Sequence, residues 1–473
     1  MRRSIALFII FSIFGSVAWF ALFILGILLG WFENPLRSLL VGAAPLLAVG
    51  IYYNITSSPL SASQSRKRIG GASVDNAEVP QKGLGLLLGT VRLPPALETQ
   101  HLIMEGANGT GKTQAIKQLI SQVLARGDKV VVIDSQYEMH RTFAAKYGGI
   151  ILSPFDESSP GWLPQNEVRT PQDWNALADT LIAKGEGSGA EWNAMARAFF
   201  TAIARGYHRE VLAAGAEFDH MALFHLLTSA SVEDIAPFLE GSAAASLADN
   251  EKGLTNVRMS FFESLAFWPD LKKGDFSVRD WVGDEDRQNL FIPHTKRTLG
   301  ALRALIATWA DQIVQEACDL GEDRDRRVWV IIDELASLGQ IPALEEATAE
   351  LRKTGFCLVV GVQNIEQIEQ RYTKTGARTI NSNLSSKLFF RVNDPDAAER
   401  ISKTIGDARH EVRSFSQSSS AQGGSTESVT EQVDRLVLAS DIQALDNLHA
   451  FVKIAGSDTT YRTIIPIYGK EKK

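Results

Sequence analysis

Residues 106–113 of this chain read Gly106-Ala107-Asn108-Gly109-Thr110-Gly111-Lys112-Thr113. They fill every fixed position of the Walker A pattern G-x-x-x-x-G-K-T. The apolar run from His101 to Glu105 predicts a short buried strand before the loop, and the residues from Gln114 to Ile120 predict a helix after it. A chance glycine turn is the alternative interpretation, and the strand–loop–helix setting disfavours it.

The chemistry of such a loop follows from its residue types. Glycines allow the backbone to curl so that its N–H groups surround an anion, and the N-terminus of the following helix adds positive potential. We expect Lys112 to reach the β- and γ-phosphates of ATP or GTP, and Thr113 to offer its hydroxyl to Mg²⁺. The expected cofactors are therefore ATP and Mg²⁺.

A second motif begins at Val328. Residues 328–332 are apolar at every position, which is typical of a strand buried on both faces of a parallel sheet, and Asp333-Glu334 follow. Carboxylates at the end of such a strand lie where ligands bind in open α/β sheets. This pattern predicts Walker B, with Asp333 holding Mg²⁺ and Glu334 orienting or deprotonating the attacking water. A strand that simply ends in solvated acids is the alternative.

A third apolar run, Phe356 to Val362, ends at Gln363-Asn364. An amide beside Walker B can sense the γ-phosphate or position water, although on spacing alone the pair fits a helix cap almost as well. Between these strands, Pro342 to Thr354 predicts a helix with Arg352 and Lys353 in its last turn. Cations favour a helix C-terminus, but Arg352 could also reach the phosphate of a neighbouring subunit as an arginine finger.

The N-terminal region predicts a membrane hairpin. Residues 5–32 contain no charged residue and can span a bilayer, and residues 39–55 form a second apolar stretch of about one span. Basic residues flank the pair at Arg2, Arg3 and 66–68, which predicts that both termini are cytoplasmic. A cleavable signal peptide fits poorly because the apolar run is too long and a second one follows.

Charge restricts the possible partners. The chain has a net charge of −7, and residues 1–68 hold six basic residues but one acidic residue, so the rest is more acidic still. This argues against a protein that coats DNA through its overall charge; DNA contacts would need local surfaces. Cys318 and Cys357 match no metal or redox spacing.

The pattern along the chain predicts five regions: a transmembrane hairpin (1–56), a linker (57–85), the first part of a nucleotide-binding domain (86–168), an all-α domain (169–273) and the second part of the nucleotide-binding domain (274–473). The Ser- and Gln-rich residues 414–428 predict a flexible loop. Six aromatic residues of the helical region are expected in its core rather than as stacking platforms for bases: Trp192, Phe199, Phe200, Phe261, Phe262 and Trp268.

Taken together, these features resemble the type IV coupling proteins of bacterial conjugation and type IV secretion, of the TraD/TrwB type. The resemblance covers essentially the whole chain. It is carried by the membrane hairpin, the Walker A loop, the stretches 156–166, 191–192 and 274–281, the signature Asp333-Glu334-Leu335-Ala336-Ser337-Leu338, and Gly361-Val362-Gln363.

The resemblance implies an α/β fold with a RecA-like P-loop domain, an inserted all-α domain and a homohexameric, inner-membrane ATPase. Such a protein would couple single-stranded DNA with covalently attached relaxase, and the relaxosome accessory proteins, to the type IV secretion channel. Gln363 matches the polar sensor of the family and Arg352 falls at the spacing of its trans-acting arginine. Two alternatives stay open, an ATP-switched docking receptor for secreted protein substrates and an FtsK/HerA-like DNA translocase.

Overall fold

The structure is a computed structural model that describes residues 64–76, 85–184, 188–284, 288–417 and 425–469, with isolated positions between 21 and 30. The chain divides into two compact units. One comprises residues 1–69 and 409–432, and the other comprises residues 70–408 and 433–473. Each unit is described by itself.

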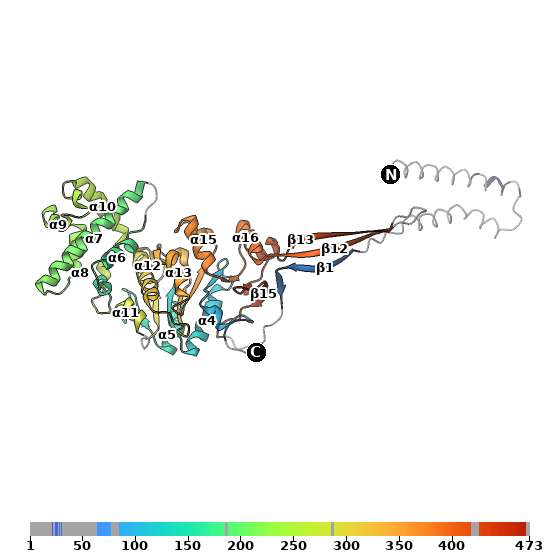
Figure 1. Cartoon of the computed structure of the whole chain (residues 1–473), viewed down its shortest axis with the longest axis horizontal. Coiled ribbons are helices and arrows are strands. Elements are labelled where there is room, and N and C mark those ends of the chain that lie inside the picture. The colour runs from blue at the N-terminus through green and yellow to red at the C-terminus, as the bar shows by residue number, and fades with distance from the viewer. Residues whose placement is uncertain are drawn as a thin grey trace. The chain divides into compact units, whose positions relative to one another are not determined.

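A sheet of ten strands, counted over the described residues, forms the centre of the larger unit (Figure 1). In spatial order the strands are β2 (Ser73–Asp75), β15 (Thr459–Ile464), β14 (His449–Lys453), β11 (Ser386–Phe389), β5 (Leu102–Glu105), β10 (Phe356–Val362), β9 (Val328–Ile332), β6 (Lys129–Asp134), β8 (Leu290–Pro293) and β7 (Ile150–Ile151).

The sheet is mixed, and its parallel part holds the two motifs. Strands β11, β5, β10, β9, β6, β8 and β7 run parallel, whereas β14 pairs antiparallel with both β11 and β15. Every residue of β9 and β10 is buried, as expected for strands covered on both faces. The register places Glu105 opposite Val362, and Ile332 opposite both Val360 and Ile133. The loops after β5, β10, β9 and β6 therefore share one edge of the sheet.

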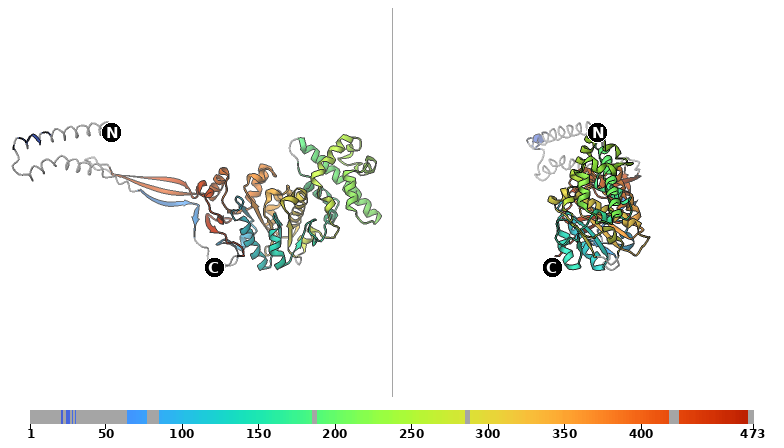
Figure 2. Two further views of the ribbon diagram at one scale, coloured as in Figure 1. Left: turned by 180° about the vertical axis from the view of Figure 1, so that it is seen from behind. Right: turned by 90° about the vertical axis from the view of Figure 1, so that its left-hand side faces the viewer.

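Helices cover both faces of this sheet (Figures 1 and 2). On one face lie α12 (Lys296–Asp319), α13 (Pro342–Leu351), α15 (Lys374–Asn383) and α16 (Pro395–Ile405), and on the other lie α4 (Lys112–Arg126) and α5 (Glu138–Tyr147). The apolar faces of α12, α13 and α15 pack in one hydrophobic cluster, those of α4 and α5 in a second, and that of α16 in a third.

A block of five helices lies between β7 and β8 in the chain: α6 (Asp173–Leu181), α7 (Ser188–Ala214), α8 (His220–Thr228), α9 (Val232–Leu239) and α10 (Glu251–Ser264). Its core is continuous with the cluster beneath α12 and α13. Four of the six aromatic residues that the sequence predicted in this core are buried there: Phe199, Phe200, Phe261 and Trp268. The prediction is wrong for Trp192 and Phe262, which are 42% and 90% exposed, because helical spacing alone does not show which face of a helix packs.

Two stretches on either side of the helical block meet at its base. Trp162 bridges to Phe276 in a short parallel pair, and Glu167, which is fully buried, accepts hydrogen bonds from Trp162 Nε1 (2.6 Å) and from the backbone of Val278 (2.8 Å) and Arg279 (3.1 Å). Burial raises the pKa of Glu167, and these hydrogen bonds oppose the rise. The Glu167 carboxylate thus connects the segment before the helical block to the segment after it.

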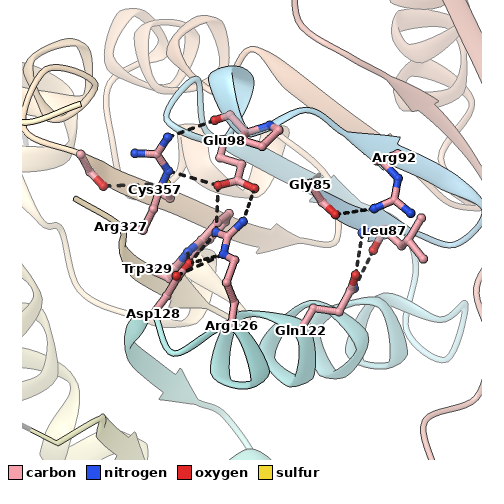
Figure 3. Close-up of polar contacts among 12 residues, drawn as sticks. Gly85, Leu87, Arg92, Glu98, Gln122, Arg126, Asp128, Arg327, Trp329 and Cys357 are labelled. Atoms are coloured by element: carbon pink, nitrogen blue, oxygen red, sulfur yellow. Dashed lines mark hydrogen bonds and ion pairs between the residues drawn. The ribbon is translucent and has the colours of Figure 1, made fainter. Parts of the chain in front are cut away.

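At the edge of the sheet opposite the motif loops, a buried carboxylate joins three segments (Figure 3). Glu98, at the end of α3 (Pro95–Glu98), accepts two hydrogen bonds from Arg126 (2.8 and 2.9 Å) and one from Arg327 Nε (3.2 Å). Asp128 in turn accepts from Trp329 Nε1 at 2.9 Å. The Glu98 carboxylate is stable in its buried position only because it is paired with these arginines. The cluster therefore fixes α3, α4 and the start of β9 together.

The described part of the smaller unit contains most of a three-stranded sheet of order β1 (Gln64–Gly71), β12 (Asp407–Gln417), β13 (Ser425–Arg435). The prediction of a flexible loop over residues 414–428 is therefore wrong at 414–417 and 425–428, which are strand. In an exposed ribbon the backbone supplies the pairing and polar side chains can face water on both sides, so composition resembles that of a loop. Strands β1 and β2 also fall within the predicted linker.

The predicted membrane hairpin lies almost entirely outside the described residues. Among the residues that are described, no helix has the length and apolar character needed to cross a bilayer.

Candidate nucleotide-binding site

The glycine loop connects β5 to α4, as the sequence predicts. Gly109 and Gly111 have φ angles of +77° and +126°, values that L-residues with a Cβ rarely adopt. A Cβ on Gly106 would lie 2.5 Å from Cβ of Phe390, so the loop also needs glycine for close packing. The first N–H groups of α4 have no partner within the helix, and they begin at this loop.

Segments from the C-terminal part of the chain support the loop. Leu448 donates its N–H to the carbonyl of Thr110 (2.7 Å), and Ala107 donates to the carbonyl of Arg391 (2.8 Å). Leu448 itself has a φ of +70°, and its side chain lies against Gly111. The antiparallel strands β11 and β14 thus help to hold the loop in position.

Lys112 is buried at the base of the loop. Its Nζ donates to the carbonyl oxygens of Gly106 (2.5 Å) and Ala107 (3.3 Å). Burial lowers the pKa of Lys112, whereas the nearby carboxylates of Glu334, Asp333 and Glu105 act in the opposite direction. The structure thereby brings the Walker A lysine within electrostatic reach of both predicted Walker B acids.

Asp333 and Glu334 directly follow β9 at the same edge of the sheet. Asp333 is buried and accepts a hydrogen bond from Ser135 Oγ at 2.5 Å. Burial raises the pKa of Asp333, and the neighbouring Asp134 raises it further. Burial also raises the pKa of Glu334 to about 7, against the effect of Lys112. A carboxyl group with its pKa near neutrality can accept or release a proton at physiological pH.

Gln363 and Asn364 turn out to have different environments. Gln363 lies close to Glu334, and its polar groups oppose the rise that burial causes in the pKa of that carboxyl group. Asn364 Oδ1 instead accepts from the backbone N–H of Gln367 (3.1 Å) at the start of α14 (Glu366–Glu369). The helix-cap interpretation therefore applies to Asn364, and the sensor role of Gln363 stays a prediction.

Arg352 lies away from the loop. It follows α13 and precedes β10, and it is exposed. Burial lowers the pKa of His101, the residue just before β5, and the charge of Arg352 lowers it further. Arg352 is therefore at the edge of the sheet opposite Lys112, Asp333 and Glu334, and the structure does not bring it to the site of its own chain.

Sequence reasoning missed three contributors to this site. Ser135 donates a hydrogen bond to Asp333. Its position directly after β6, at the same edge of the sheet, is the feature of the sequence that could have indicated this contact. Arg400 of α16 binds both oxygens of the buried Glu105 and, through Nε, Glu366 (3.2 Å). Arg400 lies 295 residues from Glu105, so no local pattern connects them. Leu448 likewise has no signature in the sequence.

The side chains present fit a magnesium–nucleotide complex. Glu334 Oε1 is buried and has no hydrogen-bond partner among the described residues, which is costly unless a ligand satisfies it. Carboxylate oxygens suit Mg²⁺, and the lysine and the loop N–H groups suit phosphates. The arrangement defines a P-loop α/β nucleotide-binding fold.

Comparison with known proteins identifies the family to which this nucleotide-binding protein belongs. A family model described as "Type IV secretion-system coupling protein DNA-binding domain" matches residues 85–465. The chain belongs to this family of coupling proteins.

The similarity to individual proteins supports the same family assignment. The chain is 29% identical over 374 residues to the coupling protein TraD of Escherichia coli strain K12, covering 76% of this chain and 51% of TraD. It is 24% identical over 294 residues to the protein VirD4 of Rhizobium radiobacter, covering 59% of this chain and 42% of VirD4. The chain thus spans about half the length of the curated relatives it matches.

A solved structure of the bacterial conjugative coupling protein TrwB, lacking its first segment, matches this chain with a TM-score of 0.74 at 29% identity, covering 86% of this chain and 95% of that one. TrwB has also been solved with the ATP analogue ADPNP (TM-score 0.73, 28% identity) and with ADP and Mg²⁺.

Proposed function

We propose that this protein hydrolyses ATP to drive single-stranded DNA through a type IV secretion channel during conjugation. The observation that carries the proposal is the convergence of Lys112, Asp333, Glu334 and Gln363 at one edge of the sheet. The complexes of TrwB with ADPNP and with ADP and Mg²⁺ support ATP and Mg²⁺ as the cofactors.

In this proposal each site residue has a role set by its position. The loop Gly106–Thr113 and the start of α4 hold the phosphates, with Lys112 against the β- and γ-phosphates. Thr113 and Asp333 hold Mg²⁺, and Ser135 orients Asp333. When bound, Mg²⁺ neutralises charge that develops on the phosphate oxygens. Glu334 accepts the proton of the attacking water, and Gln363 orients Glu334.

We further propose that the catalytic site is completed by another copy of the chain. Arg352 is exposed and lies at the far edge of its own sheet, so it can act on a phosphate only across a subunit interface. A ring of six subunits would give every site such an arginine. An arginine finger supplied in this way contributes about 10³- to 10⁵-fold to turnover in other P-loop enzymes.

The cellular setting is also part of the proposal. The apolar residues 5–32 and 39–55 would anchor the chain by two spans in the bacterial inner membrane, with both termini and the ATPase domain in the cytoplasm. The substrate would be single-stranded DNA with covalently attached relaxase, delivered with the relaxosome accessory proteins to the secretion channel.

The direct test is ATP hydrolysis by the purified full chain with single-stranded DNA, with double-stranded DNA and without DNA. We expect hydrolysis that single-stranded DNA stimulates and that Lys112→Ala abolishes. Hydrolysis that survives Lys112→Ala would contradict the assigned site. Stimulation by double-stranded DNA alone would favour an FtsK/HerA-like translocase.

One observation favours a second role, as a docking receptor for protein substrates. On α10, Met259 and Phe262 are 69% and 90% exposed and lie one turn apart. Exposed large apolar side chains of this kind are typical of protein contacts. A pure receptor carrying Lys112→Ala would still bind the relaxosome, whereas a motor carrying this substitution would move no DNA.

A further inference from the structure

A basic segment without acidic residues follows the Gln363 strand. Residues 370–393 contain five basic residues and no Asp or Glu, in a chain whose net charge is −7. Two of the five are engaged locally. Lys387 Nζ donates to the carbonyl of Asn381 (2.8 Å), and Arg391 donates to Asn447 Oδ1 (2.9 Å). The other three are Arg371, Lys374 and Arg378.

Lys374 and Arg378 lie on the exposed face of α15, and Arg371 lies in the turn just before the helix. Ala377 and Ile380 on the inner face of α15 are buried. Tyr372, just before the helix, is also buried, and its hydroxyl accepts a hydrogen bond from the backbone N–H of Ile341 (3.2 Å) at the start of α13. Lys374 and Arg378 are four residues apart, so they lie one above the other on the helix. All three basic side chains are exposed.

The three charges are not neutralised. Within the described part of the chain, no carboxylate forms an ion pair with Arg371, Lys374 or Arg378. Like charges four residues apart destabilise a helix, so packing alone does not account for the placement of Lys374 and Arg378. A flexible polyanion would neutralise these charges, because Lys and Arg on one face can contact successive phosphates.

The position of this face links it to the nucleotide site. The chain runs from Gln363 through α14 directly into α15. Glu366 of α14 pairs with Arg400, and Arg400 also binds Glu105 immediately before the glycine loop. Arg400 therefore joins the base of the glycine loop to α14, the helix that directly precedes α15.

We propose that Lys374 and Arg378 on the exposed face of α15, together with Arg371 in the turn before it, contact the phosphate backbone of single-stranded DNA. This inference rests on the proposed DNA transport and names a surface of the motor that holds its substrate. It requires no base-specific contact, so the same face would accept any sequence.

The test compares two double variants of the full chain with equal changes in net charge. Lys374→Gln/Arg378→Gln removes two charges of the proposed surface. Lys146→Gln/Arg324→Gln removes one lysine and one arginine that are also exposed, at the end of α5 and in the loop before β9. Binding of a fluorescent single-stranded oligonucleotide is measured by anisotropy as a function of salt, together with ATP hydrolysis with and without that oligonucleotide.

For the α15 variant we expect binding about tenfold weaker or more and a salt dependence whose slope is smaller by about 1.4, which corresponds to two lost phosphate contacts. Its hydrolysis without DNA should stay at the wild-type rate while the stimulation by DNA is lost. The control variant should match the wild type.

Other outcomes are separable. Equal DNA binding by both variants would overturn the α15 proposal while leaving DNA transport intact. Unchanged DNA binding with a smaller oligomer in sedimentation would also overturn it and would show that this face binds another copy of the chain. Failure of the unsubstituted protein to bind the oligonucleotide would overturn both proposals.

Discussion

Arg400 forms an ion pair with both carboxylate oxygens of Glu105, the buried residue that ends β5 immediately before the glycine loop. Burial raises the pKa of Glu105, and the hydrogen bonds and charge of Arg400 oppose that rise. The same guanidinium holds Glu366, three residues after Gln363. One side chain therefore connects the base of the phosphate loop with the segment that follows the proposed sensor.

Removing this arginine should destabilise the protein. Arg400→Ala would leave Glu105 buried without its partner, and breaking a buried pair in this way costs about 3 kcal/mol or more. We expect a lower apparent Tm for the full chain by calorimetry. Adding Glu105→Gln should recover part of the loss, since the uncompensated charge is gone. Equal apparent Tm values for Arg400→Ala and the wild type would contradict a structural role for the pair.

Glu334→Gln should separate binding from hydrolysis. The amide keeps the size of the side chain but cannot accept a proton from water, so we expect hydrolysis to fall by a factor of about 100 or more. Binding of a fluorescent ATP analogue with Mg²⁺ should persist, because Lys112, Thr113 and Asp333 are unchanged. The matched control is Glu345→Gln, an acid on α13 outside the proposed site. Undiminished hydrolysis by Glu334→Gln would exclude this residue as the base.

The stability of the protein should depend on pH through His101. Burial lowers the pKa of His101 to about 4, and its ring bonds the carbonyl of Thr348 (2.8 Å) and the N–H of Leu358 (3.1 Å). Because the folded-state pKa lies below the unfolded value of 6.5, stability is fully present above pH 6.5 and is lost as pH falls toward 4. The total loss is about 3 kcal/mol.

The measurement is the apparent Tm of the wild type and of His101→Asn between pH 7 and pH 4. Asn tolerates the positive φ of +61° at this position, so the backbone conformation is preserved. We expect the wild-type Tm to fall more steeply than that of the variant across this range. Parallel curves would show that His101 titrates normally.

Much of this fold was predictable because its signals are local. The glycine loop and the apolar strands ending at Asp333 and Gln363 are continuous in sequence, and parallel strands bring their carboxyl ends to one edge. The different environments of Gln363 and Asn364 could not be predicted from the sequence, because they depend on the geometry of α14. The contacts of Ser135, Arg400 and Leu448 join segments far apart in the chain, and only the folded structure pairs them.

The shared site between subunits is the central claim, and mixing two inactive variants tests it most directly. Lys112→Ala should disable the phosphate loop of its own chain, and Arg352→Ala should disable the neighbouring site, so each alone should hydrolyse ATP at least about 100-fold more slowly than the wild type. Co-expressed in one oligomer, a Lys112→Ala chain can supply Arg352 to the intact loop of an Arg352→Ala chain. We predict that the mixed oligomer regains hydrolysis. A mixture as inactive as either variant alone, or wild-type hydrolysis by Arg352→Ala alone, would contradict the account.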